Sequence, residues 1–103
     1  MSSKSVKLLM TWNIQSNREA EYSEFVVNEF IPRLNRIGLF DLEFWYTRYG
    51  ECDQIQASGI SESMEQIQNI FSSEEWENLH AMLLEYVTDY QQKIIRATRG
   101  FQL

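Results

Sequence analysis

The chain lacks the residues that several kinds of functional site require. It has one cysteine, Cys52, and one histidine, His80, so it cannot form an intramolecular disulfide or a zinc site built from several cysteine and histidine ligands. Cys52 lies between Glu51 and Asp53, and neighbouring negative charge disfavours the reactive thiolate. We therefore expect no metal site of this kind, and a reduced thiol without catalytic duty in a loop.

Basic residues and long hydrophobic runs are also scarce. The chain has 9 Lys and Arg against 15 Asp and Glu, a formal charge of -6. Because nucleic acids and anionic membranes are bound largely through Lys and Arg, we expect neither as a partner. No apolar run approaches the roughly 18 residues of a membrane span, and no signal peptide is recognised at the start. These features predict a cytoplasmic protein.

The hydrophobic pattern predicts the secondary structure. Hydrophobic residues make up 44% of the 103 residues, enough for one packed domain spanning 1–103. Residues 6–14 alternate as a strand that places Leu8, Met10, Trp12 and Ile14 on one face. Residues 18–37 follow with helical spacing; Pro32 predicts a kink or break inside this helix, and Gly38 its end.

The second half predicts a hairpin, two short helices and a last strand. Residues 40–49 and 54–60 are predicted strands joined by a loop at 50–53. Capping boxes starting at Ser63 and at Ser72 predict consecutive helices, the second running to about Val87, and residues 93–98 predict a strand. The order β-α-β-β-α-β is typical of the α+β, ferredoxin-like fold, with helices on one face of a four-stranded antiparallel sheet.

The uncovered face of this sheet predicts a homodimer. Leu9 and the aromatic residues of the second strand, with Trp45 or Tyr46 as candidates, suggest a face too apolar for water. A second copy of the chain, stacking its own sheet there, is the expected cover. Gln54, Gln56 and Ser58 alternate along one side of the third strand and fit a solvated or inter-subunit face.

Two motifs resemble those of the dimeric α+β barrel superfamily. Residues 17–25, NREAEYSEF, resemble that group's Gly-[Lys/Arg]-Glu-x-Glu-[Phe/Tyr] start of the first helix, with Asn17 in place of the usual glycine. Residues 73–76, SEEW, resemble the SxEW start of its last helix. The resemblance covers nearly the whole chain and implies a dimeric α+β barrel. The group includes antibiotic-biosynthesis-type and haem-degrading monooxygenases, muconolactone isomerases and NIPSNAP-type proteins.

The haem-degrading branch offers a residue-by-residue comparison. His80 falls on the position of the iron-ligating histidine of that branch. Met10 falls on the position of the asparagine that this branch has on its first strand, and Ile70 falls on the position of its tryptophan. One match in three implies no haem degradation, and we expect no cofactor.

His80 is the candidate catalytic residue. It belongs to a stripe of Trp76, Leu79, His80, Leu83, Leu84 and Val87 that predicts the buried face of its helix, near Met10 or Trp12. A neutral imidazole can remove a proton from a phenol or enol, the step that starts cofactor-free oxygenation. The alternative is a histidine that is packed in the core with one nitrogen satisfied.

Two functions remain open. The first is a cofactor-independent monooxygenase or isomerase-like enzyme acting on a small aromatic or polyketide-like compound. Its pocket would be lined by Met10, Trp12, Phe25 and Trp76, with His80 as proton shuttle. The second is a non-catalytic dimer that binds a small molecule or has a structural role, in which these aromatic residues form core or interface.

Overall fold

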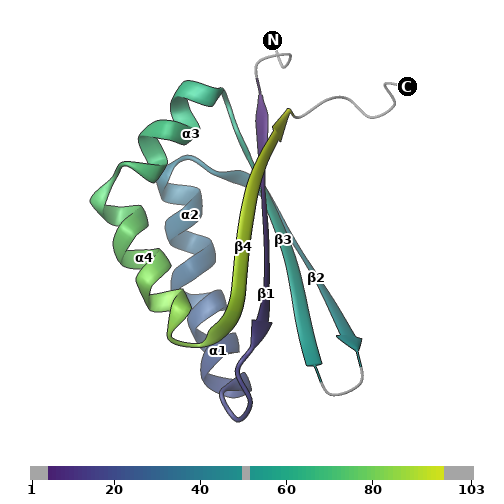
Figure 1. Ribbon diagram of the computed structural model, residues 1–103. Helices are drawn as coiled ribbons and strands as arrows, with labels where there is room; N and C mark the ends of the chain where they lie inside the picture. Colours follow the sequence, from purple (N-terminus) through teal and green to yellow (C-terminus); the bar gives the residue numbers. More distant parts are fainter. Residues whose placement is uncertain (1–4, 50–51, 97–103) are drawn as a thin grey trace.

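The computed structural model describes residues 5–49 and 52–96. The elements, in chain order, are β1 (Val6–Ile14), α1 (Glu19–Phe25), a π-helical turn η2 (Val26–Phe30), α2 (Ile31–Ile37), β2 (Phe40–Tyr49), β3 (Cys52–Ser61), α3 (Met64–Phe71), α4 (Glu74–Leu84) and β4 (Val87–Arg96). The strands form one antiparallel sheet in the order β2-β3-β1-β4, and the helices lie on one side of it (Figure 1). The predicted α+β, ferredoxin-like architecture is confirmed.

The first strand occupies an inner position of the sheet and carries the core. Leu8, Met10 and Trp12 are 0–1% exposed, whereas Leu9 and Thr11 between them are only partly buried. This alternation follows from the two-residue period of a strand, which directs successive side chains to opposite faces. The predicted range and inward face of this strand are therefore confirmed, and the core lies between β1 and the helices.

The first helical region stays helical through Pro32. Instead of a break, the chain makes the π-helical turn η2, in which the Ile31 N–H donates to the Val26 carbonyl, and Pro32 then opens α2. The wider turn lies directly before the proline, which has no N–H to donate and is tolerated in a first helical turn. The predicted stop is confirmed, because Gly38 ends α2 with a φ of 116°.

The start of α4 differs by one residue from the prediction. The Ser73 hydroxyl accepts a hydrogen bond from the Trp76 N–H at 3.1 Å and donates one to the Ile70 carbonyl at 2.6 Å. Ser72 instead ends α3. The predicted cap at Ser63 is confirmed, since its hydroxyl accepts from the Gln66 N–H.

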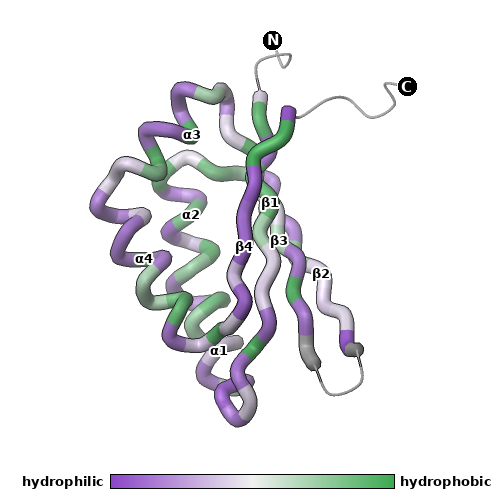
Figure 2. Tube along the Cα trace, viewed as in Figure 1, coloured by the Kyte–Doolittle hydropathy of each residue, from purple (hydrophilic) through white to green (hydrophobic). Residues whose placement is uncertain are grey.

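The last strand is the main error of the sequence-based assignment. Helix α4 ends at Leu84 rather than near Val87, and β4 begins at Val87 rather than at residue 93. Residues 97 and 98, the predicted end of this strand, lie outside the described residues. The middle of β4 is hydrophilic in Figure 2, so its local sequence pattern does not indicate a strand. This segment is a strand because it pairs with β1.

A bulge interrupts this pairing. Thr11 pairs with Gln91 but Asn13 pairs with Thr88, so β4 holds one extra residue there. Asp89 takes a φ of 56°, and its carboxylate accepts a hydrogen bond from the Asn13 side-chain amide at 2.9 Å.

The hairpin is tighter than predicted. Tyr49 pairs with Cys52, so Cys52 lies in β3 rather than in a loop, and only residues 50 and 51, outside the described ranges, separate the strands.

The two serines before α4 allow a direct test of its cap. Ser73→Ala removes the side-chain acceptor of the Trp76 N–H and should lower the free energy of unfolding by about 1 kcal/mol. Ser72→Ala is the matched control and should change it by much less. Urea unfolding followed by circular dichroism measures both. An equal loss in the two variants would contradict the assignment of Ser73 as the cap.

Candidate functional site

The predicted pocket residues are all buried in the core. Met10, Trp12, Phe25 and Trp76 are all 6% exposed or less. The Trp12 ring meets the rings of Tyr22, Phe30 and Phe44 edge-on, with centroids 5.9–6.4 Å apart. Its indole N–H donates a hydrogen bond to the Tyr22 hydroxyl at 3.0 Å. Burial raises the pKa of Tyr22 to about 12, so this phenol is neutral at physiological pH.

His80 lies between two aromatic rings at the margin of this core. Its imidazole stacks on Trp76, one helical turn earlier, with centroids 5.3 Å apart and planes 10° from parallel. The ring of Tyr90 meets it edge-on at 4.6 Å. Burial lowers the pKa of His80 below its ordinary value, because desolvation disfavours the imidazolium. The side chain is therefore a neutral imidazole at physiological pH.

One atom of His80 lacks the partner that buried polar atoms normally have. Among the described residues, no group forms a hydrogen bond with its Nε2, and this nitrogen is shielded from solvent. A buried polar group without a partner costs about 1–3 kcal/mol. The alternative prediction, a packed histidine with one nitrogen satisfied, is therefore fulfilled only in part. The ring is packed, but its buried Nε2 has no hydrogen-bond partner among the described residues.

Tyr90, from β4, joins His80 to Trp12. Its ring stacks on Trp12 with centroids 5.9 Å apart and planes 11° from parallel, and its hydroxyl donates to the side-chain oxygen of Gln92 at 2.7 Å. Burial raises its pKa. Sequence analysis missed this residue because it lies between the predicted end of the helix, near Val87, and the predicted start of the strand at residue 93. The two-residue spacing of Tyr90, Gln92 and Ile94 was the available signal.

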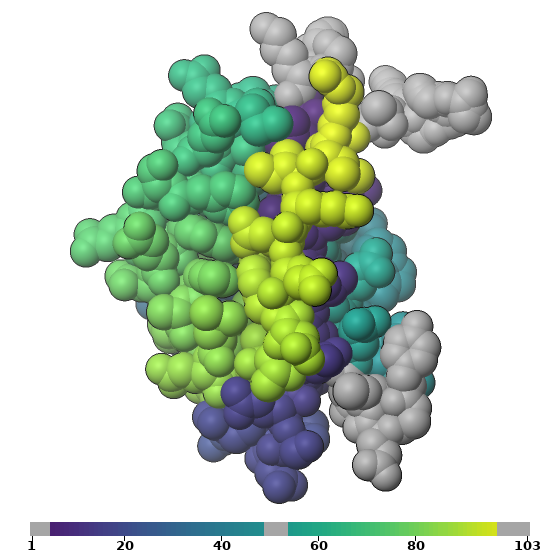
Figure 3. All heavy atoms as spheres, viewed as in Figure 1, coloured from purple at the N-terminus to yellow at the C-terminus, as the bar shows by residue number. Residues whose placement is uncertain are grey.

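The predicted stripe of α4 is wider than its buried face. Trp76, Leu79 and Leu83 are buried, Leu84 is 43% exposed, and Val87 is buried as part of β4. His80 is half-buried and faces the seam between α4 and β4, where Tyr90 lies between it and the predicted neighbour Trp12. Figure 3 shows the side chains of α4 and β4 meeting along this seam.

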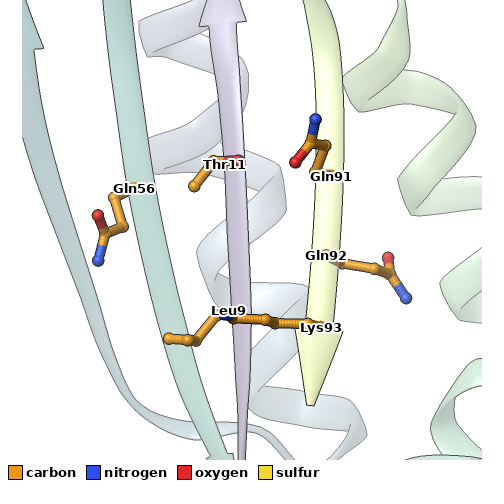
Figure 4. Close-up of a pocket in the computed structure, with 6 residues that line it drawn as sticks. All are labelled: Leu9, Thr11, Gln56, Gln91, Gln92 and Lys93. Carbon is orange, nitrogen blue, oxygen red and sulfur yellow. The ribbon is translucent and has the colours of Figure 1, made fainter. Parts of the chain in front are cut away.

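Four surface hollows formed by described residues lie elsewhere. One, of about 320 Å³, lies on the open sheet face (Figure 4) and is lined by Leu9, Thr11, Gln56, Gln91, Gln92 and Lys93. Another, of about 500 Å³, lies between α1 and α4 and is lined partly by Glu21, Glu24 and Glu29. None of the four is lined by His80, Met10, Trp12 or Trp76. The predicted pocket residue Phe25 lines the hollow between α1 and α4. The Nε2 of His80 is shielded from solvent in this structure.

The open face of the sheet is more polar than predicted. Strand pairing places on this face the apolar residues Leu9, Phe40, Trp45, Ile60 and Ile95 together with the polar residues Lys7, Thr11, Asn13, Glu43, Thr47, Gln54, Gln56, Ser58, Thr88, Gln91 and Lys93. Tyr46 pairs with the inward-facing Ile55 and so lies on the helix side, which leaves Trp45 as the one of the two candidates that lies on the open face. Gln54, Gln56 and Ser58 do share the open face, as predicted.

Within residues 5–49 and 52–96, no three His, Cys, Asp or Glu residues are grouped as metal ligands would be. No helix in the same ranges is long and apolar enough to span a membrane.

Comparison with known proteins shows similarity in structure. No family model matches the sequence, and no curated protein matches it. SnoaB, a cofactor-independent oxygenase from Streptomyces nogalater, superimposes with a TM-score of 0.75 at 10% identity, covering 97% of this chain and 99% of SnoaB. A hydroxynitrile lyase from Passiflora edulis superimposes with a TM-score of 0.77 at 8% identity, covering 96% and 98%.

A third similar structure is a NIPSNAP family protein from Agrobacterium tumefaciens. It has a TM-score of 0.68 and 16% identity, and the match covers 94% of this chain and 89% of that protein. At such identities the likeness concerns the fold, which hosts different activities. The chain shares the predicted ferredoxin-like α+β fold with these proteins.

Proposed function

We propose that this chain is a cofactor-independent enzyme that removes a proton from a small aromatic compound, with His80 as the base. The observation that carries this proposal is the buried, unsatisfied Nε2 of His80. A ligand hydroxyl donating to this nitrogen would remove the cost of leaving it unpaired. The aromatic rings next to His80, such as that of Trp76, suit a flat ligand.

The chemistry follows from the charge state of the imidazole. With its pKa lowered, His80 is unprotonated at neutral pH and can accept the proton of a phenol or enol. The resulting anion is electron-rich enough to react with molecular oxygen. A CH2 group activated in this way would become a carbonyl, with one oxygen atom of O2 entering the product and the other leaving as water.

The structural likeness to SnoaB supports this class of reaction by analogy of fold, since that protein is a cofactor-independent oxygenase. The hydroxynitrile lyase with the same fold shows that other chemistry is hosted by it.

A specific observation favours the non-catalytic alternative. Met10 and Trp12 are 0% and 1% exposed, so two of the residues predicted to line a pocket instead fill the core. In that case Trp76, His80 and Tyr90 form only a packed aromatic cluster.

Turnover distinguishes the two functions. Wild type should consume oxygen with at least one member of a panel of bicyclic and tricyclic phenols, without added flavin, haem or metal. His80→Gln, which cannot act as a base, should lose about 100-fold or more of this rate. Leu84→Ala, an exposed site on the same helix, should retain it. Full activity of His80→Gln would contradict the assigned role, and inactivity of wild type across the panel would favour the non-catalytic function.

The lowered pKa of His80 also predicts a pH dependence of stability. The unfolded chain, with a histidine pKa of about 6.5, binds the proton at higher pH than the folded chain does. The stabilising contribution is therefore complete above about pH 6.5 and is lost as the pH falls toward the folded pKa. The unfolding free energy of wild type should decline in this window relative to His80→Gln. Parallel pH profiles of the two proteins would contradict the lowered pKa.

We also propose that the chain is a homodimer formed through the open sheet faces. Trp45 and Ile95 are 50% and 39% exposed on this face. Pairing places Glu43, Ser58, Leu9 and Lys93 in one row across the sheet, with Glu43 on one edge strand and Lys93 on the other. A two-fold axis parallel to the strands would set Glu43 of each copy opposite Lys93 of its partner.

Two neighbouring aromatic residues test this dimer. The mass in solution should be twice 12.3 kDa, measured by light scattering at micromolar concentration. Trp45→Arg, on the open face, should shift the protein toward monomer by placing two unpaired cations at the contact. Tyr46→Arg lies on the opposite side of the same strand and should leave the dimer intact. A monomeric wild type would rule out the proposal.

A further inference from the structure

The side chain of Tyr90 makes the ring contacts with Trp12 and His80 that an aromatic ligand would make. Its phenol ring lies flat on Trp12 and edge-on to His80, at centroid distances of 5.9 and 4.6 Å. Stacked and edge-on arrangements are the two geometries that aromatic rings prefer. Its hydroxyl, however, donates to Gln92 and leaves the buried Nε2 of His80 without a partner. Tyr90 therefore makes the ring contacts expected of a phenol at this position, but it does not make the hydrogen bond to the Nε2 of His80.

Tyr90 lies on an edge strand, next to a bulge. Strand β4 is at the edge of the sheet, and Tyr90 directly follows Asp89, which lies in the bulge with a φ of 56°. A bulge disrupts the ladder locally and sets the direction of nearby side chains. The partner of the Tyr90 hydroxyl, Gln92, is itself exposed. Moving this ring therefore breaks no pairing in the interior of the sheet.

We infer that Tyr90 occupies the ligand position of a closed site, and that a phenol binds by displacing its ring. The incoming ring would stack on Trp12 and contact His80, and its hydroxyl would donate to Nε2, supplying the hydrogen bond that Tyr90 does not make. This inference rests on the proposed function for the identity of the ligand as a substrate. The binding event itself needs no turnover.

Displacement reduces the affinity that the open site would have, because only the open fraction of molecules binds. Any change that loosens Tyr90 without altering Trp12 or His80 should therefore strengthen binding. Gln92 is suited to this test, since its side chain contacts the tyrosine hydroxyl at 2.7 Å and is exposed. Gln91, the preceding residue, points to the other face of the sheet and provides the matched control.

The experiment measures the binding of 2-naphthol by the NMR signals of the His80 ring, which are unambiguous because the chain has one histidine. Gln92→Ala should bind about threefold more tightly than wild type, the value of one modest hydrogen bond. Tyr90→Ala, which empties the position, should bind about tenfold more tightly or better. Gln91→Ala should bind as wild type does. Because Gln92→Ala removes only an exposed side chain, the test does not depend on the folding of the Tyr90 variant.

A second measurement uses the wild-type protein. The cross-relaxation signal between the Tyr90 and His80 rings, expected at their separation of 4.6 Å, should vanish when 2-naphthol saturates the protein. Persistence of this signal in the bound state, equal affinity of Gln92→Ala and Gln91→Ala, or no binding by any of the four proteins would overturn the inference. Displacement of Tyr90 in a protein without oxygen uptake would leave this inference standing while the proposed function fails.

Discussion

The burial of Trp12 is the constraint on which most of this structure depends. An indole N–H in a core needs an acceptor, and the Tyr22 hydroxyl supplies it at 3.0 Å, which fixes α1 against β1. The faces and edges of the same ring contact Phe30 of the π-helical turn, Phe44 of β2 and Tyr90 of β4. The side chain of Trp12, on an inner strand, thus contacts α1 and η2 in the helical layer and β2 and β4 in the sheet.

The aromatic contacts continue outward from this core and change in character. Trp12 is packed on all sides, whereas Tyr90 and His80 are half-buried at the seam between an edge strand and a helix. The buried ring of Trp12 therefore lies next to the half-buried ring of Tyr90, which in turn contacts an imidazole with an unsatisfied nitrogen. A binding site needs both a fixed surface and a route of entry, and the seam is where these described residues provide them together.

Several elements were predictable because their signals are local. The bounds of β1 follow from alternation alone, and Ser63 and Gly38 act through bonds and dihedral angles within one turn of their helices. Asn17 is of the same kind: it takes a φ of 67°, a conformation in which glycine is best and asparagine is tolerated. This explains why the superfamily motif usually has glycine there and why its replacement leaves the start of the first helix intact.

The sequence by itself determined the order of elements, the inward face of β1 and the aromatic nature of the core, because these depend on neighbours a few residues apart. Only the tertiary structure decided that the hydrophilic middle of β4 is a strand, since its hydrogen-bonding partners lie in β1, far along the chain. The same pairing, with its bulge at Asp89, brings Tyr90 between Trp12 and His80. The sequence therefore pointed to His80 within its own helix but not to Tyr90, because this ring is placed by contacts some 80 residues apart in sequence (Trp12 to Tyr90).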